Sequence, residues 1–297
     1  MTNSRFDQTE QAERELHLQL AAFNAKRFQP SLPDASDWRA DLSEQTHDLL
    51  LEGEYLDAER AKIATWAAEA PRDAVAFGKW FENLKAVGPG QNDPLFPWLA
   101  NVATMQQMQW FLTQEIAGEA GFEDLTALTQ IRLPVRPKLE LARNYWDEMG
   151  RGQAKGMHGP LLEHLGKALA LEPHVETSVW EALALANTMA GLAANRRFAY
   201  HSVGALGVIE MTAPDRAAAV AQGLKRLGVP AGDRHYFALH SILDVKHSLA
   251  WNAEAIVPLV TEKPECAVAI AEGALMRLEA GRRCFDRYRA HFGLQLH

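Results

Sequence analysis

The sequence is poor in several features that define other classes of protein. Only two cysteines, Cys266 and Cys284, occur in 297 residues, which argues against a disulfide framework and indicates a reducing compartment. Lysine and arginine together number 30 against 38 aspartates and glutamates, so no basic surplus is present to neutralise nucleic-acid phosphates or an anionic membrane surface. The polar N-terminus and the lack of a run of about 18 uncharged apolar residues argue against a signal peptide and a transmembrane helix. We therefore expect a cytoplasmic protein without nucleic-acid or membrane partners.

Alternating strand patterns are also missing, and helical patterns follow one another along most of the chain. No stretch alternates apolar and polar residues over the length of a strand between hairpin turns. The glycine- and proline-rich stretch 87–94 interrupts the helical patterns. We predict an all-α fold, in which a bundle of about seven long helices spans residues 95–297 and an N-terminal helical extension spans residues 1–94.

Three polar residues share one face of an otherwise apolar helix predicted over residues 236–251. His240, Asp244 and His247 are spaced i, i+4 and i+7, so at roughly 100° per residue their side chains project from one side. Polar groups on a buried face need a compensating partner. A divalent metal is such a partner, because imidazole and carboxylate together suit iron, manganese or zinc. The alternative is a hydrogen-bonded polar cluster in the helical core.

A metal needs further ligands from other helices, and three stretches supply candidates. Glu115 follows an apolar run, with Glu119 one turn later as a rival. Glu148 and His158 flank a segment rich in glycines, which weaken a helix and let the backbone bend around a site. Glu210 ends a run of small and apolar residues, an unfavourable place for a solvated carboxylate. Each of them also has a plainer interpretation as a helix-end or partly buried side chain.

Together these residues form a set of four carboxylates and three imidazoles. Its members are Glu115, Glu148, His158, Glu210, His240, Asp244 and His247. Four carboxylates carry a charge that balances two divalent cations, whereas a lone zinc would not need so many. Carboxylate-rich sites with a few histidines inside helical bundles are the usual setting of di-iron and di-manganese centres.

These motifs resemble those of the haem-oxygenase-like di-iron oxidases and oxygenases, also described as iron-containing redox enzymes. The most specific motifs are Glu210 followed by His240 thirty positions later, the triplet that begins at His240, and Glu148 followed by His158 ten positions on. The resemblance implies a seven-helix fold like that of haem oxygenase, without bound haem. It also implies two iron ions (Fe²⁺/Fe³⁺), whose di-ferrous form reacts with dioxygen. Known reactions of the family include amine N-oxygenation and oxidative C–C cleavage of amino acids or fatty acids.

The resemblance leads to a prediction of function. We predict a non-haem di-iron oxidase or oxygenase that uses dioxygen to oxidise a small amine, amino-acid or fatty-acid-like substrate, with no catalytic residues beyond the metal ligands. The resemblance covers roughly residues 95–292. Within it, Glu115 matches the metal ligand that the family carries on its first helix. The extension over residues 1–94 lies outside it, and we expect this extension to form a homodimer; an external electron donor is a further candidate partner. The alternative is a metal-free thiaminase-like or cofactor-binding protein on the same fold.

A basic and aromatic stretch before Glu210 supplies candidate contacts to the substrate. Arg197, Tyr200 and His201 lie two to four helical turns before this glutamate. Arg197 and His201 are four residues apart and share a helix face, so they could bind a substrate carboxylate. The alternative for Arg197 is a salt-bridged surface patch.

Overall fold

The computed structural model describes residues 2–32, 38–119 and 121–294, and the all-α prediction is confirmed. Within these ranges every regular element is helical, and the one strand-like pairing is an isolated antiparallel bridge between Met149 and Met157. The principal helices are α1 (Thr2–Phe28), α2 (Trp38–Ala67), α3 (Ala74–Val87), α4 (Leu95–Asn101), α5 (Met105–Ala117), α6 (Phe122–Thr129), α7 (Val135–Glu148), α8 (His158–Ala168), α9 (Trp180–Ala194), α10 (Ala199–Arg226), α11 (His235–Ala250), α12 (Val257–Glu262) and α13 (Cys266–Phe292). Short 3₁₀ or π segments join some of them: η1 (Gly150–Gly152), η2 (Ala154–Gly156), η3 (Val175–Thr177), η4 (Arg196–Phe198) and η5 (Trp251–Ile256).

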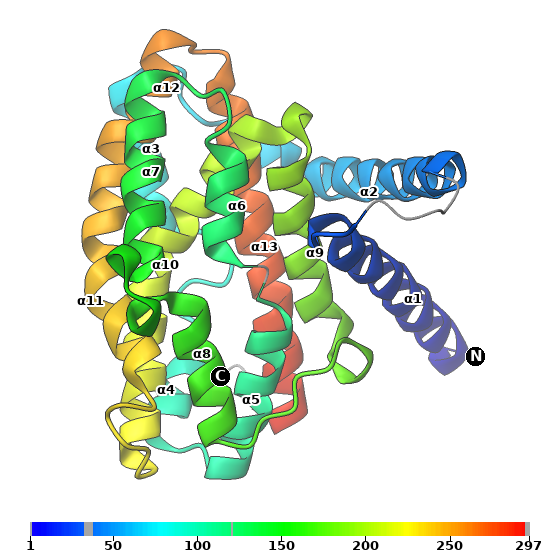
Figure 1. Ribbon diagram of the computed structural model, residues 1–297, viewed down its shortest axis with the longest axis vertical. Helices are drawn as coiled ribbons and strands as arrows, with labels where there is room; N and C mark the ends of the chain where they lie inside the picture. The colour runs from blue at the N-terminus through cyan, green and yellow to red at the C-terminus, as the bar shows by residue number, and fades with distance from the viewer. Residues whose placement is uncertain (1, 33–37, 120, 295–297) are drawn as a thin grey trace.

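The two long helices α10 and α13 cross at the centre of the bundle in direct backbone contact (Figure 1). A Cβ atom added at Gly204 of α10 would lie 1.9 Å from the carbonyl oxygen of Ile270, and one added at Gly273 of α13 would lie 1.8 Å from that of His201. Glycine is therefore required at both positions, because any side chain would push the helices apart. This close crossing fixes α10, which carries Glu210, relative to the rest of the core.

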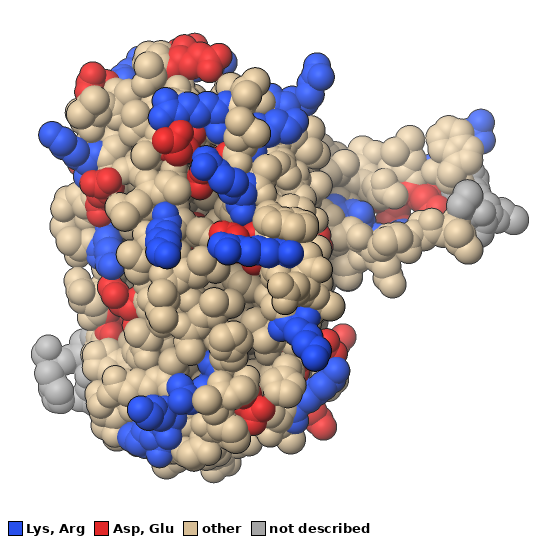
Figure 2. Space-filling view, turned by 60° about the vertical axis from the view of Figure 1, so that its left-hand side comes forward, with Lys and Arg blue, Asp and Glu red and all other residues tan. Residues whose placement is uncertain are grey.

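The N-terminal helices α1 and α2 form a hairpin that projects to one side of the bundle (Figures 1 and 2). Its inner part is anchored, since the Tyr55 hydroxyl lies 2.7 Å from the Thr188 hydroxyl and Asn24 donates a hydrogen bond to Asn187. Towards its outer end, Trp38 and Leu42 are exposed. Positive and negative side chains are interspersed over the face of the molecule seen in Figure 2.

The extension and the bundle share one hydrophobic core. Leu20, Ile63 and Phe81 from the extension belong to the same buried cluster as Leu206 of α10 and Ile270 of α13. The domain boundary near residue 94 stays a prediction. The homodimer is also still a prediction. Among the described residues, none of the helices combines the length and the apolar character needed to span a bilayer.

Candidate metal centre

Four helices bring the central candidates together. Glu148 is the last residue of α7 and His158 is the first residue of α8. Glu210 lies in the middle of α10, which packs against α11. His240 and His247 lie on α11, as the helical spacing predicts.

The loop between Glu148 and His158 explains how residues ten positions apart become neighbours. Met149 and Met157 pair across its base as an antiparallel bridge. Gly150 has φ 59°, and a Cβ atom there would lie 2.4 Å from the carbonyl carbon of Gly156. The glycines, interpreted from sequence as weak points of a helix, therefore serve a closed loop in which the two sides touch.

The structure places five of the predicted residues in two overlapping groups with the spacing of metal ligands. Glu148, His158 and His240 form one group, and Glu148, Glu210 and His247 form the other. Within each group the potential ligand atoms all lie within 4.8 Å of one another. Glu148 belongs to both groups, so its carboxylate lies where it could bridge two ions.

Several polar atoms in these groups are buried without a hydrogen-bond partner. They include Nε2 of His158 and Nε2 of His240, while Nδ1 of His247 and Oε2 of Glu210 have only each other, 3.4 Å apart. Buried polar atoms are nearly always satisfied in proteins, and a cation at the centre of the cluster would satisfy all four. Imidazole nitrogens and carboxylates are a donor set that iron accepts. The residues present therefore fit a metal centre.

Carboxylates outside the two groups hold two of the histidine rings. Asp244 accepts a hydrogen bond from Nδ1 of His240 at 3.0 Å, which leaves Nε2 of that ring directed elsewhere. Asp147 lies 3.0 Å from Nε2 of His247, whose Nδ1 lies 3.4 Å from Glu210. A carboxylate that holds one ring nitrogen and leaves the other for the metal is typical of metal-bound histidines. His240 has this arrangement, whereas the second nitrogen of His247 faces Glu210, itself a member of the same ligand group. Asp244 belongs to neither group, and its role as a ligand stays a prediction.

The pKa values of three residues in the cluster are raised by their surroundings. Burial raises the pKa of Glu148 to about 9, and the neighbouring charges of Glu210 and Asp244 act in the same direction. Burial alone would lower the pKa of His240 and His247, but the carboxylates beside them, Asp244 for His240 and Glu210 for His247, raise both to about 9. Near neutral pH the metal-free cluster therefore holds protons that a cation would displace.

His158 behaves differently from the other two histidines. Burial and the charge of His240 lower its pKa to about 4, so its imidazole is neutral at pH 7. A neutral imidazole is the form that binds a metal. His158 is thus ready to coordinate without losing a proton.

The first-helix candidates are not part of either group. Glu115 lines the neighbouring cavity, where burial raises its pKa against the opposing effects of Tyr288 and two arginines. Glu119 lines the same cavity and lies closer to the histidines, since the charge of His240 acts on its pKa. Glu123 lies nearer still to His158: its Oε1 would be 3.2 Å from a Cβ atom added at Gly159. The choice among these glutamates stays a prediction.

The structure does not bring the three predicted substrate contacts to this site. Arg197 is exposed and lies 3.5 Å from Asp57. The ring of Tyr200 lies under the ammonium group of Lys263, and His201 lies 2.7 Å from Glu272. None of the three lines the cavity beside the metal cluster.

Three residues near the cluster were not predicted from sequence. Asn144 donates a hydrogen bond to Glu210, Asp147 holds His247, and the ring of Tyr236 lies 4.4 Å from that of His240. Asn144, Asp147 and Glu148 share a side of α7, because they are spaced by three and four residues. This spacing could have identified Asn144 and Asp147 from the sequence. Tyr236, one helical turn before His240, had the same kind of signal.

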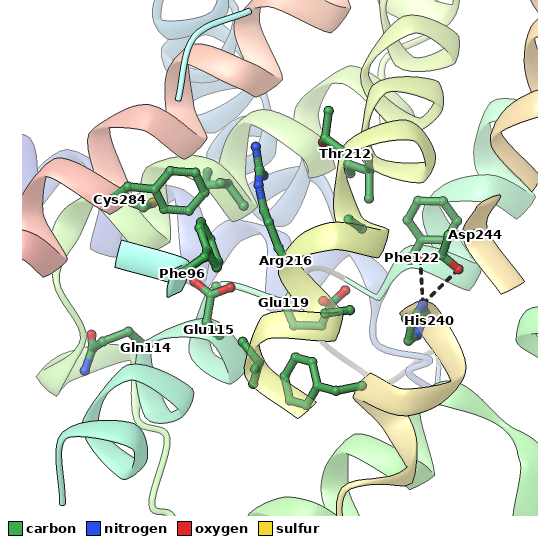
Figure 3. A pocket seen from close by; sticks show the side chains of 18 of the residues that line it. Phe96, Gln114, Glu115, Glu119, Phe122, Thr212, Arg216, His240, Asp244 and Cys284 are labelled. Atoms are coloured by element: carbon green, nitrogen blue, oxygen red, sulfur yellow. Dashed lines mark hydrogen bonds and ion pairs between the residues drawn. The ribbon is translucent and has the colours of Figure 1, made fainter. Parts of the chain in front are cut away.

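A cavity of about 190 Å³ opens beside the cluster. Glu148, Glu210, His240 and Asp244 form part of its wall. Figure 3 shows His240 and Asp244 on one side of it, with Glu119 between them and Glu115. The volume lies below the ~300–1,000 Å³ of typical drug-sized ligand sites, so the cavity suits a small molecule.

An all-α bundle with a buried carboxylate and histidine cluster beside a small cavity defines a class of helical metalloproteins. Residues 109–282 match the family described as iron-containing redox enzymes, and the protein belongs to this family. The matched segment covers more than half of the chain and contains every predicted metal ligand. No curated protein matches the chain. The protein is therefore an iron-containing oxidoreductase by family, as the resemblance in the sequence predicted.

Proposed function

We propose that the protein is a non-haem di-iron oxidase or oxygenase that acts on a small organic substrate. The observation that carries the proposal is the pair of ligand groups that share Glu148. His158 and His240 would complete one iron site, and Glu210 and His247 the other. When bound, the two ions supply the electrons for dioxygen activation. A haem site would not require this cluster of carboxylates.

The remaining residues of the site would position these groups and shape their surroundings. Asp147 holds His247 and Asp244 holds His240, so each ring presents a fixed nitrogen to the cluster. Asn144 donates a hydrogen bond to Glu210, which orients the free oxygen of that carboxylate. The largely apolar wall of the cavity would limit the water around the substrate. An amine, an amino acid or a fatty-acid-like molecule is the proposed substrate class, and an external reductant the proposed source of electrons.

A metal-free, cofactor-binding function on the same fold is the second candidate. It offers no partner for the buried, unsatisfied Nε2 atoms of His158 and His240. The di-iron proposal accounts for these atoms, so we favour it.

Anaerobic titration with Fe²⁺ tests the proposal directly. We expect close to two iron ions per chain and iron-dependent uptake of dioxygen. His158→Ala should lower the iron stoichiometry and abolish oxygen uptake, while circular dichroism shows an intact helical fold. His164→Ala is the matched control, because His164 lies on the same helix but its side chain is exposed. Tight stoichiometric binding of zinc, without any iron-dependent oxygen uptake, would contradict the proposal.

Metal affinity is expected to increase with pH. His240, His247 and Glu148 all have a pKa of about 9 in the metal-free protein, so binding must displace protons below that pH. Each displaced proton makes the apparent affinity rise about tenfold per pH unit, and the rise should level off once the pH passes these pKa values. Titrations with Mn²⁺, between roughly pH 6.5 and 8.5, measure this slope. An affinity that does not change with pH would show that the cluster is already deprotonated.

A further inference from the structure

Two arginines line the cavity beside the metal cluster. Arg216 lies on α10 and Arg277 on α13, so they come from the two helices that cross at the centre of the bundle. Charged side chains seldom line a largely buried cavity unless they have a partner or a function there. The positive charge of each arginine should therefore be neutralised by a nearby group or by a ligand.

Neither arginine forms an ion pair with any residue that the structure describes. The guanidinium of Arg216 lies against aromatic faces, 4.8 Å from the ring centre of Phe285 and 5.6 Å from that of Phe96. Arg277 has no hydrogen bond, ion pair or aromatic contact within the described ranges, and its Nε is buried without a partner. Its side chain lies over Gly281, where a Cβ atom would come within 2.8 Å of a guanidinium nitrogen.

The carboxylates nearby do not cancel this positive charge. Glu115 and Glu119 line the same cavity and attract Arg277, but within the described residues neither comes close enough to Arg216 or Arg277 for an ion pair. Burial and the repulsion from Arg277 lower the pKa of Arg216 to about 9, which is still above neutral pH, and a guanidinium group in general stays protonated in proteins. Two guanidinium groups without ion pairs on one cavity wall leave room for an anion.

The rest of the cavity describes the molecule that would carry this anion. Apolar side chains line much of its wall: Phe96, Phe111, Leu185, Val220, Phe237 and Phe285. Arg216 follows Glu210 by six residues on α10, which corresponds to roughly 9 Å along the helix axis. In Figure 3, Arg216 and the pair His240 and Asp244 lie on different sides of the cavity. Arg216 thus lies apart from the metal cluster, and the wall between them holds Glu119 as well as apolar side chains.

We propose that Arg216 and Arg277 bind the carboxylate of a small substrate with a short apolar chain, whose opposite end lies at the metal cluster. A carboxylate fits better than a phosphate monoester. Glu115 and Glu119 in the same cavity already offset part of the positive charge of the arginines, so a ligand with a single negative charge is favoured. The inference deepens the proposed function and rests on it for the chemistry at the far end. It replaces Arg197 as the candidate for carboxylate recognition, and it places the oxidised position of the substrate away from the carboxylate.

Binding of hexanoate, hexanamide and inorganic phosphate to the metal-free full-length protein tests this proposal by calorimetry. Hexanoate should bind at least tenfold more tightly than hexanamide or phosphate. Arg216→Gln and Arg277→Gln should each weaken hexanoate binding by about 10- to 100-fold, the usual effect of losing a hydrogen bond to a charged group. Arg197→Gln is the control, since Arg197 is exposed and lies outside the cavity, and it should bind hexanoate like the wild type.

Stability provides a readout that a merely structural role would not give. An arginine without an ion pair is unfavourable in the ligand-free protein, so Arg277→Gln should raise its melting temperature, while added hexanoate should stabilise only proteins that retain both arginines. Lower stability of Arg277→Gln without ligand would show that the arginine supports the fold. That result, equal binding of hexanoate and hexanamide, or unchanged binding in both glutamine variants would overturn the proposal. Tighter binding of phosphate would overturn the choice of a carboxylate.

Iron titration of the same proteins separates this inference from the function on which it rests. Arg216→Gln and Arg277→Gln should still bind two iron ions, because neither residue belongs to the ligand groups. If wild-type protein binds hexanoate through the arginines but takes up no iron, the di-iron function fails and the anion site stands. If it binds iron but not hexanoate, only the anion site fails.

Discussion

Replacing Glu148 with glutamine is expected to remove both metal ions, the largest effect of any single change in the cluster. Glu148 is the one residue that belongs to both ligand groups. Glutamine keeps the size of the side chain but cannot carry the negative charge or bridge two cations. Metal analysis should show the stoichiometry falling from about two ions to well below one, and iron-dependent oxygen uptake should fall to background. Glu210→Gln, which changes one group only, should retain one ion.

The metal-free Glu148→Gln protein should nevertheless be about as stable as metal-free wild type. Because burial raises the pKa of Glu148 to about 9, its carboxyl group is neutral at pH 7 in the absence of metal, and glutamine resembles this form. The difference between the two proteins should appear only when metal is added, as a rise in melting temperature confined to the wild type. Glu140→Gln is the matched control, since Glu140 is a buried carboxylate on the same helix outside both groups. Retention of two ions by Glu148→Gln would refute the shared-ligand arrangement.

Gly273→Ala is expected to destabilise the whole protein severely. The added methyl group would lie 1.8 Å from the carbonyl oxygen of His201, a backbone atom that cannot rotate away. The helices α10 and α13 would have to separate, which would open the core on both sides of the crossing. Overpacking a core usually costs about 1–3 kcal/mol and sometimes more, and we expect at least the upper end of that range here. Urea denaturation and the yield of soluble protein measure the effect.

A glycine outside the crossing provides the control for this substitution. Gly53 lies within α2, and a Cβ atom there would meet nothing within 4 Å. Gly53→Ala should therefore stabilise the protein by up to about 1 kcal/mol through helix propensity alone. Opposite signs for the two glycine-to-alanine changes would support the backbone crossing. A Gly273→Ala protein as stable as wild type would show that the helices do not approach so closely.

Local periodicity was sufficient to predict part of this site. His240 and His247 lie on one helix, so their spacing alone placed them on a common face, and the structure brings both to the cluster. The first-helix ligand could not be predicted in the same way. Glu115, Glu119 and Glu123 are spaced by four residues, but α5 ends at Ala117, and the chain no longer follows a single helix after that point. Helical spacing therefore cannot rank these three.

The arginines show a second limit of sequence interpretation. Arg197 and His201 have the spacing of a shared helix face, yet they lie near the start of α10, far from the part of that helix that lines the cavity. Arg216 and Arg277 are separated by 61 positions in the sequence (277 − 216) and meet only because α10 and α13 cross. No local sequence pattern indicates that these two arginines are close in space. Predicting this proximity requires the tertiary packing.

The bridge between Met149 and Met157 also bears on how related sites can be found in other sequences. Because these two residues close the loop at its base, the segment between them can change length without moving Glu148 or His158. Lengthening a surface loop costs little, about 0.6 kcal/mol for each doubling. The ten-residue separation of the glutamate and the histidine is thus a property of this loop rather than a requirement of the metal centre. A search that fixes this interval would miss proteins in which an insertion has enlarged the loop, whereas one that allows the interval to vary would find them.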